Sequence, residues 1–471
     1  MNGYILRFLL TLSMCCALLV AFAVSKSTHL VIASAGPSVK LSAKTGPPTS
    51  FLTVTATGFG NDEKITISFD SASVGIGVTS TSGTFTMKIQ VPGIVTPGTH
   101  VVRAMGQTSG LSSQAAFLVQ TNWSAFGFDT HHTRFNSFEN VLNSTNVSSL
   151  VSGWSYATGS SILSSPAVAN GMAYFGSDDH KLYALSASAG SVLWSYTTGG
   201  DIRSSPAVAN GVVYVGSLDF KVYAFNATLG ALRWTYTTGN SIESPPSVVN
   251  GVVYIGSDDH NVYALNASTG AVLWSYPTGS DIGFSSPVVV NGTVYVGSED
   301  DTIYALSAST GKLVWSYRAH DEIYSSPAVS YGMVYASSKD GNLYALNANT
   351  GKLKWSYSTL GPVTSSPAIA NKIVYVGSQD SAVYALNAAT GSLIWKYTTG
   401  SIIGLSSAAV ANGVLYIGSD DFKLYALNAA TGAFLWFYMT GSEIMSSPVV
   451  ADGVVYVGSE DDTLYTFHVA S

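Results

Sequence analysis

The chain has 471 residues, of which only 10% are charged, and its formal net charge is −7. A mildly acidic chain without a lysine and arginine cluster lacks the basic surface that tracks phosphates, which argues against nucleic-acid binding. The 46 glycines and 27 tyrosines suit sheets and tight turns rather than helical bundles or disorder.

Residues 1–35 have the pattern of an export signal. Arg7 precedes an apolar run over residues 8–24, and small residues follow at Ala33-Ser34-Ala35. The run is close to the shortest length that spans a bilayer, so an uncleaved membrane anchor stays open as an alternative. Both cysteines, Cys15 and Cys16, lie in this run, so no disulfide can join the exported part. We expect an exported protein, either secreted or attached to the cell surface or envelope, with membrane contact only through this segment.

Residues 36–120 have the alternation of a small antiparallel sandwich. Apolar and polar residues alternate over residues 51–56, 65–69 and 85–91, and turn residues separate these runs. The motifs Ala56-Thr57-Gly58-Phe59-Gly60 and Pro97-Gly98-Thr99-His100 resemble bacterial cell-surface immunoglobulin-like modules. The resemblance implies a spacer or an adhesive stalk.

Residues 121–152 show no period and predict a connecting strap. From residue 153 to residue 471 one unit recurs every 40 or 41 residues, and its copies close on a tryptophan. These tryptophans are Trp154, Trp194, Trp234, Trp274, Trp315, Trp355, Trp395 and Trp436. A unit of four short strands cannot bury both of its faces alone, so units must stack around an axis. We therefore predict an all-β chain: an eight-bladed β-propeller of four-stranded blades, preceded by a small immunoglobulin-like sandwich.

Each repeat has the same order of strands and turns. A strand after Ser-Ser-Pro ends in a turn, which is Asn-Gly in five copies, and this dipeptide accepts the positive φ of a two-residue hairpin. A second tight turn carries one aspartate per copy, and the last strand ends in the tryptophan. We assign the tryptophans to packing between blades rather than to ligand binding, because they stand at the same place in an outer strand.

The two ends of the repeat array complement each other. A lone fourth strand, Gly153-Trp154-Ser155-Tyr156, precedes the first full copy, and the last copy stops after its third strand. We predict that the segment around Trp154 pairs with the final blade, so that hydrogen bonds between the two ends close the ring.

No metal or catalytic site can be read from the spacing of the titratable residues. One carboxylate per copy at the same register is what a tight turn needs to accept backbone N–H groups, which favours a structural role over calcium binding. His131 and His132 are adjacent in extended chain and point to opposite sides, so we do not expect them to share a metal ion.

The loops that join the fourth strand of one copy to the first strand of the next differ most between copies. Because packing forces the blades to be alike, function is expected where they differ. The candidate ligand face consists of Arg203, Glu243, Asp281, His320, Asp321, Glu322 and Glu443. Simple drift of these loops is the alternative.

The stretch Tyr263-Ala264-Leu265-Asn266-Ala267-Ser268-Thr269-Gly270-Ala271-Val272-Leu273-Trp274 and its echoes resemble the tryptophan-docking repeat of quinoprotein dehydrogenases and related PQQ-like propellers. The strap, from Trp123 to Asn136, is similar to the segment before the first blade in that superfamily. The resemblance implies the fold. It does not carry over a catalytic, PQQ-binding or calcium-binding residue, because the enzymes' adjacent disulfide-bonded cysteines and their long insertions are missing from the blades.

Two functions remain open. We expect a non-catalytic scaffold, similar to the non-enzymatic members of the superfamily, that acts as a monomer without a cofactor and binds an envelope or extracellular protein, peptide or glycan. The alternative is an alcohol or sugar dehydrogenase that depends on calcium and PQQ.

Overall fold

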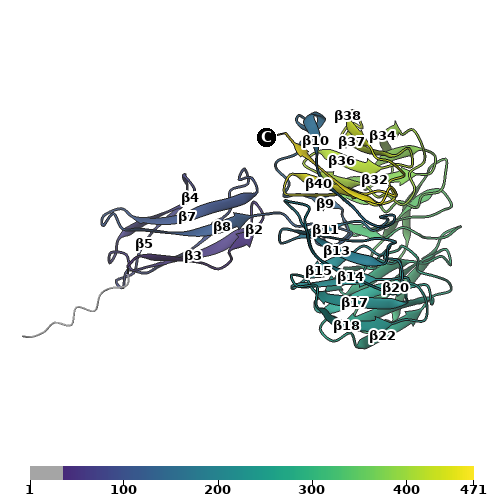
Figure 1. The fold of residues 1–471 in the computed structure, drawn as a ribbon, viewed down its shortest axis with the longest axis horizontal. Coiled ribbons are helices and arrows are strands. Elements are labelled where there is room, and N and C mark those ends of the chain that lie inside the picture. Colours follow the sequence, from purple (N-terminus) through teal and green to yellow (C-terminus); the bar gives the residue numbers. More distant parts are fainter. Residues whose placement is uncertain (1–35, 471) are drawn as a thin grey trace, which may run out of the picture.

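The computed structural model describes residues 36–470, and the regular secondary structure of these residues is almost entirely β-strand (Figure 1). A single short 3-10 helix, η1 (Val147–Ser149), is the one helix in this range. No helix among the described residues is long and apolar enough to cross a membrane. The predicted export signal, with Cys15 and Cys16, lies outside the described residues.

Residues 38–119 form a sandwich of two sheets, which Figure 1 shows beside the rest of the molecule. One sheet has the order β1 (Ser38–Leu41), β3 (Phe51–Thr57), β6 (Phe85–Gln90). The other has the order β2 (Thr45–Gly46), β8 (Ser112–Val119), β7 (Gly98–Gly106), β4 (Lys64–Phe69), β5 (Ala72–Val78). The inward residues of the alternating strands, such as Val54, Ile67 and Phe117, are buried between the sheets. The likeness of this sandwich to immunoglobulin modules stays a prediction.

The rest of the described chain forms eight four-stranded blades. In seven of them the strands follow chain order from the inside of the ring outward, and in the eighth the outer strand comes from before the first blade. Blades 1 to 4 are β11 (Ala167–Ala169), β12 (Met172–Gly176), β13 (Lys181–Ser186), β14 (Val192–Thr197); β15 (Ala207–Ala209), β16 (Val212–Gly216), β17 (Lys221–Asn226), β18 (Leu232–Thr237); β19 (Ser247–Val249), β20 (Val252–Ser257), β21 (Asn261–Asn266), β22 (Val272–Pro277); and β23 (Val288–Val290), β24 (Thr293–Gly297), β25 (Thr302–Ser307), β26 (Leu313–Arg318).

Blades 5 to 8 continue the series. They are β27 (Ala328–Ser330), β28 (Met333–Ser337), β29 (Asn342–Asn347), β30 (Leu353–Ser358); β31 (Ala368–Ala370), β32 (Ile373–Ser378), β33 (Ala382–Asn387), β34 (Leu393–Thr398); β35 (Ala409–Ala411), β36 (Val414–Gly418), β37 (Lys423–Asn428), β38 (Phe434–Met439); and β39 (Val449–Ala451), β40 (Val454–Gly458), β41 (Thr463–Val469), β10 (Leu150–Ala157). The predicted fold class, an all-β eight-bladed propeller, is confirmed.

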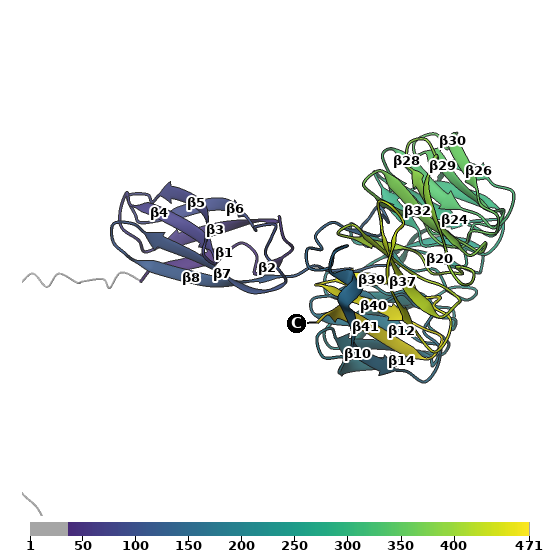
Figure 2. The same ribbon diagram turned by 90° about the horizontal axis from the view of Figure 1, so that it is seen from above.

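The ring closes as predicted, because β10 supplies the outer strand of blade 8. It pairs antiparallel with β41, with Leu150 opposite Val469 and Ala157 opposite Thr463. Figure 2 shows β10 beside β41, next to the outer strand of blade 1. The last blade therefore has no unpaired third strand that a second chain could extend.

The hairpin turns explain why the repeat folds in this register. Asn170 has a φ of 53° and Gly171 a φ of 76°, and the same pair of positive values recurs at the first turn of the other blades. Asparagine and glycine tolerate this conformation, which matches the twist of a two-residue hairpin.

The tryptophans connect neighbouring blades. The indole Nε1 of each of the first seven donates to an alanine carbonyl of the next blade, over 2.8 to 3.1 Å. At the boundary between the two ends of the ring, for example, Trp154 donates to Ala187 over 2.9 Å. The eighth, Trp436, packs edge-on against Phe467 with ring centroids 5.1 Å apart, and no hydrogen bond of its indole is found within residues 36–470.

The interface between blades 7 and 8 also leaves a tyrosine hydroxyl without a partner. Tyr375 donates its hydroxyl to the carbonyl of Ala429 in the next blade over 3.0 Å, and six other blades have the equivalent hydrogen bond. The buried hydroxyl of Tyr416 has no partner among the described residues. Blade 8 lacks the turn that carries this alanine, because its fourth strand comes from the other end of the array. Within the described part of the chain, the interface between blades 7 and 8 therefore lacks the tryptophan and tyrosine hydrogen bonds that the other seven interfaces have.

Removal of the Tyr416 hydroxyl should not weaken the protein. We expect Tyr416→Phe to leave the free energy of unfolding unchanged or raise it by about 1 kcal/mol, since a buried donor without a partner is costly. The matched change Tyr375→Phe should lower it by about 1 kcal/mol, because it removes a satisfied hydrogen bond. Urea unfolding midpoints of the two variants, compared at equal slope, measure the difference. Equal losses in both variants would show that the Tyr416 hydroxyl does have a partner.

The strap, residues 121–152, runs across one end of the ring axis. It contacts the first turns of blades 1, 7 and 8: Asn122 accepts from Asn170, Asn412 donates to Leu142, and Glu139 accepts from Gly453. Strand β9 (Phe135–Asn136) of the strap adds to β35. Because the second turns lie at the other end of each second strand, the face that carries the aspartates is opposite the strap. We name this opposite face the loop face.

Candidate functional site

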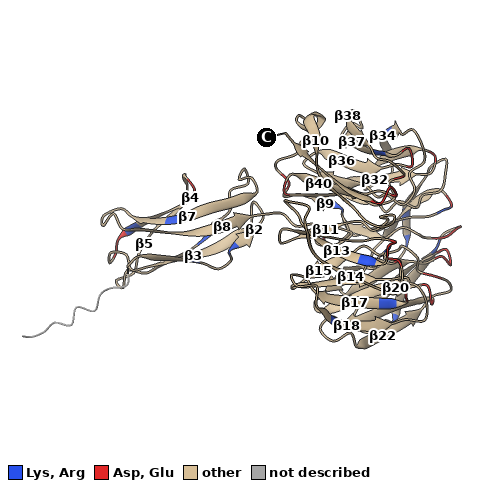
Figure 3. Ribbon diagram, viewed as in Figure 1, with Lys and Arg blue, Asp and Glu red and all other residues tan. Residues whose placement is uncertain are grey.

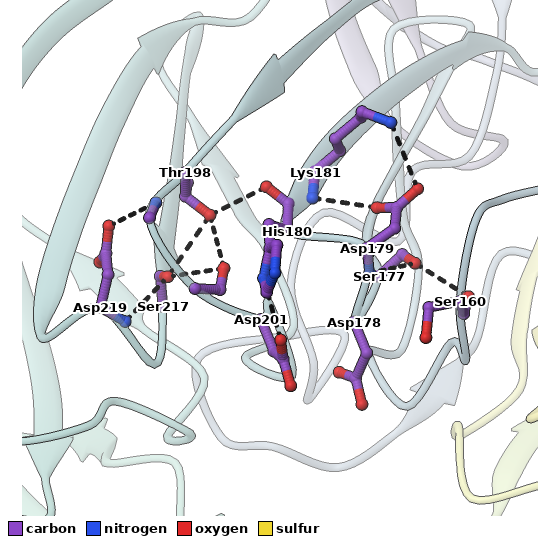
Figure 4. A network of polar contacts seen from close by, with 12 residues as sticks. Ser160, Ser177, Asp178, Asp179, His180, Lys181, Thr198, Asp201, Ser217 and Asp219 are labelled. Atoms are coloured by element: carbon purple, nitrogen blue, oxygen red, sulfur yellow. Dashed lines mark hydrogen bonds and ion pairs between the residues drawn. The ribbon is translucent and has the colours of Figure 1, made fainter.

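The repeated aspartates of the loop face hold the turns in place. Asp179 accepts the backbone N–H of Gly159 and of Lys181, each over 3.0 Å, and the hydroxyl of Tyr183. Figure 4 shows Asp179 with Lys181, and the equivalent Asp219 in the next blade. Their oxygens are thus occupied by protein donors, which is the arrangement expected of a structural residue.

The residue just before the turn aspartate points another way. In Figure 4 the carboxylate of Asp178 lies apart from the network of Asp179. Asp178 instead meets Arg203, whose guanidinium donates to it over 3.3 Å. Of the two adjacent aspartates, Asp179 therefore holds the turn, and Asp178 forms an ion pair with Arg203.

A belt of charged residues lies around much of the axis on the loop face, and we name it the acidic rim. Its ten carboxylates are Asp178, Asp201, Glu243, Asp258, Asp281, Glu299, Glu322, Asp420, Glu443 and Glu460. Their mutual charge effects link neighbours along the belt, as for Glu243 with Asp258 and Glu443 with Asp420. Two cations, Arg203 and Lys339, lie among them. The rim thus carries a large excess of negative charge when its carboxyls are ionised.

Arg203 organises one sector of the acidic rim. It donates to Asp178 and to Glu243, each over 3.3 Å, and lies 3.5 Å from Asp201. Burial raises the pKa of Glu243, and Arg203 opposes that rise. One guanidinium therefore serves three carboxylates, and the sector stays acidic.

Other sectors of the acidic rim have no cation of their own. Burial, with added repulsion from Glu243 and Asp281, raises the pKa of Asp258 to about 7. Burial, with added repulsion from Glu443, raises the pKa of Asp420 to about 6. These shifts mean that part of the negative charge of the rim is held at a free-energy cost, which a cationic ligand would relieve.

Inside the acidic rim the axis is closed by larger side chains. The residues that follow the buried isoleucine or valine of each loop converge there, and they include Leu163, Phe284, Tyr324, Leu405 and Met445. The remaining cavity has a volume of about 30 Å³ and ends at Phe126 of the strap. Lys339 lies over the ring of Tyr324, 3.8 Å from its centroid. The centre of the face is thus a shallow, largely apolar depression and not a deep pocket.

Five of the seven residues predicted for the ligand face belong to the acidic rim: Arg203, Glu243, Asp281, Glu322 and Glu443. His320 and Asp321 lie farther out and are exposed. The backbone N–H of His320 donates to Asp340, and the carbonyl of Asp321 accepts from Ser338. Both residues therefore pack against the second turn of blade 5.

Six of the ten carboxylates of the acidic rim were not in the predicted face. One is Asp201, and the other five stand directly before a turn aspartate: Asp178, Asp258, Glu299, Asp420 and Glu460. The acidic doublets in the sequence were the available signal. They showed local negative charge but not that one carboxylate of each pair turns toward the axis.

Comparison with known families agrees with the repeat and its geometry. The model of the β-propeller of beta-alanine-activating enzyme matches residues 212–403, and that of outer membrane protein assembly factor BamB, a PQQ repeat model, matches residues 399–471. The ring is a PQQ-like repeat β-propeller. No curated protein matches the chain in sequence.

Solved structures show the same propeller in proteins of different function. BamB from Moraxella catarrhalis is 22% identical, with a TM-score of 0.61, over 68% of this chain and 99% of its own. A europium-containing methanol dehydrogenase is 16% identical, with a TM-score of 0.65, over 74% and 98%. The quinohemoprotein alcohol dehydrogenase from Comamonas testosteroni is 18% identical, with a TM-score of 0.66, over 74% and 80%. At such identities this PQQ-like propeller shares the fold with them, and its function must be argued from its own residues.

The residues at the axis do not fit a quinone cofactor of the PQQ kind. A cavity of about 30 Å³ is far smaller than the pockets of several hundred Å³ that enclose such ligands. The acidic rim would also repel the carboxylates of the quinone. Within residues 36–470 no group of three or more histidine, cysteine, aspartate or glutamate side chains is arranged to hold a metal ion.

The two adjacent strap histidines diverge. His131 is exposed, whereas His132 is buried, and its burial lowers the pKa of the imidazole to about 4. Neither lies near the acidic rim, because both belong to the strap on the opposite face.

Proposed function

We propose that this protein is an exported, non-catalytic scaffold whose loop face binds a cationic segment of a partner protein. The observation that supports this most is the acidic rim around a shallow apolar depression. Figure 3 shows many of the acidic residues on ring loops turned away from the sandwich. The strap and the sandwich occupy the other side, so the loop face stays open to a partner.

The chemistry of the loop face favours lysine- and arginine-containing protein segments over other ligands. Their aliphatic stems can lie on Phe284, Leu405 and Met445 while their charged ends reach the rim. Carboxylates held partly out of water, such as Asp258, interact more strongly with an incoming cation than exposed ones do. A glycan or a neutral peptide would not neutralise the excess negative charge of the acidic rim.

The comparisons support a scaffold without deciding it. One matching family model is that of an outer membrane protein assembly factor, a description that implies protein partners. Solved neighbours with the same fold also include dehydrogenases. We propose a location at the cell surface or in the envelope and a monomeric state, and we place the dehydrogenase second because the axis does not fit the quinone.

Binding of defined peptides tests the scaffold. The probe is a fluorescent peptide of alternating lysine and leucine, with the glutamate–leucine peptide as the charge-reversed control. We expect the lysine peptide alone to bind, with an affinity that falls steeply with salt. The triple change Asp281→Asn, Glu322→Gln and Glu443→Gln should weaken binding about tenfold, whereas Asp62→Asn, an exposed residue of the sandwich, should have no effect.

Two results would contradict the proposal. Equal binding of both peptides, or of the triple variant and the parent, would remove the loop face as the site. Stoichiometric binding of added PQQ together with dye-linked oxidation of alcohols or sugars would establish the dehydrogenase instead.

A further inference from the structure

The strap hydrogen-bonds to the inner strands of most blades but not of all. In five blades the middle residue of the inner strand donates its backbone N–H to a strap carbonyl over 2.7 to 2.9 Å. The pairs are Val168 with Trp123, Val208 with Ser124, Val329 with His131, Ile369 with Thr133 and Val410 with Arg134. In blade 8 the side chain of Asn136 donates to the carbonyl of Val450. The strap thus accepts the inner-edge N–H of five blades and donates to the inner-edge carbonyl of blade 8.

Blades 3 and 4 lack this partner. The equivalent residues are Val248 and Val289, and their backbone N–H groups donate to no acceptor within residues 36–470. In a two-residue hairpin the pair beside the turn, Val249 and Val252, exchanges hydrogen bonds, so the middle pair does not. The N–H and C=O of Val248 therefore point toward the axis, as those of Val208 do.

A groove lies at this place. A cavity of about 170 Å³ is bounded by the strap on one side and by the inner strands β15 and β19 on the other, and it includes Val248, Asp129 and His132. His132 is only 5% exposed, and its Nδ1 has no hydrogen-bond partner in the described chain. The carboxylate of Asp129 is already engaged by the backbone of His131 and by Thr133. The free polar groups are thus a backbone edge and one imidazole nitrogen.

Blade 3 also breaks the serine belt of the ring. Six hydrogen bonds, each from the backbone N–H of one serine to the hydroxyl of the next over 2.8 to 2.9 Å, link the second serines of the Ser-Ser motif in seven blades. At the equivalent place blade 3 has Pro245, which has no N–H and no hydroxyl. The belt and the strap therefore depart from symmetry in the same sector.

We propose that the groove beneath blade 3 binds an extended polypeptide segment of a partner protein, which pairs its backbone with Val248. The strap shows the chemistry of the occupant, because a peptide backbone fills the equivalent positions of the neighbouring blades. The segment continues that interface by offering a carbonyl to the Val248 N–H and an N–H to the Val248 carbonyl.

The groove selects a short, uncharged stretch. Its volume suits one or two residues rather than a drug-sized ligand. Burial lowers the pKa of His132 to about 4, so this wall of the groove carries no charge at ordinary pH. This site lies on the strap side of the ring and does not depend on the acidic rim or on its proposed partner.

Hydrogen exchange of the full chain tests the groove. The probe is the acetylated and amidated peptide Thr-Val-Thr-Val-Thr, used at about 1 mM because a contact made mainly by the backbone is weak. Without peptide, the inner strand of blade 3 should exchange its amides at least about tenfold faster than that of blade 2, and with peptide this difference should shrink several-fold. Equal protection of both strands without peptide, or no effect of the peptide, would overturn the proposal.

Two substitutions sharpen the test. Val248→Pro removes the axis-facing N–H without breaking a hydrogen bond of the blade, so this variant should fold and should lose the effect of the peptide. Val329→Pro, which removes an N–H that His131 accepts, should lower the thermal midpoint of unfolding. Failure of Val248→Pro to fold would show that its N–H is already used, which contradicts the proposal.

The peptide can be varied in the same way. One isomer carries N-methyl groups on residues 2 and 4, and the other carries one on residue 3. Because only one edge of the peptide can face Val248, we expect one isomer to bind and the other to fail. Equal binding of both isomers would exclude backbone pairing.

Discussion

A chain that begins at Ser160 should lose the cooperative unfolding of the ring, whereas a chain that begins at Thr121 should keep it. The first truncation removes β10 and leaves β41 as an exposed edge. It also removes Trp154, which packs on the turn of blade 1 and donates to Ala187. The second truncation removes only the sandwich and leaves the strap and β10 in place.

The expected loss from removal of β10 exceeds about 5 kcal/mol. Truncation of a large buried aromatic residue alone costs about 3 to 5 kcal/mol, and the lost strand hydrogen bonds add to it. Calorimetry of both truncated chains measures the midpoint and the sharpness of the transition. A chain from Ser160 with the midpoint and cooperativity of the chain from Thr121 would show that the strap and β10 are not needed to close the ring.

The sequence predicted the features of the ring that depend on local pattern. Asn170-Gly171 and its equivalents specify hairpin turns, because only a few residues accept two positive φ values in succession. The closure at Trp154 followed from counting strands. The last copy lacks its fourth strand, and one extra fourth strand precedes the first copy. Period and turn chemistry act over a few residues, which is why they can be read without a structure.

The features that break the symmetry of the ring could not be predicted from such patterns. The strap has no period, and Arg134 finds its carbonyl acceptors in Ala408 and Ser407, more than 270 residues away. Adjacent aspartates such as Asp178 and Asp179 look alike in the sequence, yet one holds a turn and the other faces Arg203. Their roles depend on which side of a tight turn each side chain takes and on contacts between blades.

The two proposed sites lie on opposite faces of the ring and differ in chemistry. The acidic rim draws on charges of several blades, and its affinity should depend on salt. The groove beneath blade 3 draws on one strand edge, and its affinity should not. Salt dependence therefore separates the two sites even in the same preparation of the protein.

The Asp258→Asn variant should be more stable than the parent above pH 7. Burial and the neighbouring carboxylates raise the pKa of Asp258 in the folded protein to about 7, above its value in the unfolded chain. The folded state thus holds this proton more tightly, so stability falls as the pH rises from about 4 to about 7 and the carboxyl ionises. Because Asp258 is partly exposed to solvent, we expect a gain in the free energy of unfolding of about 1 to 2 kcal/mol from the variant.

Asp259 provides the control one residue away. Its carboxylate accepts from Gly239 over 2.7 Å and from the Tyr263 hydroxyl over 2.7 Å, so Asp259→Asn should lower stability by about 1 to 3 kcal/mol at pH 8. Urea unfolding of the parent and both variants at pH 4.5 and pH 8 provides the comparison. The gain of Asp258→Asn should be present at pH 8 and nearly absent at pH 4.5, because the parent carboxyl is then protonated and uncharged like the amide. A gain of equal size at both pH values would mean that packing, and not the ionisation of Asp258 in the acidic rim, causes the change.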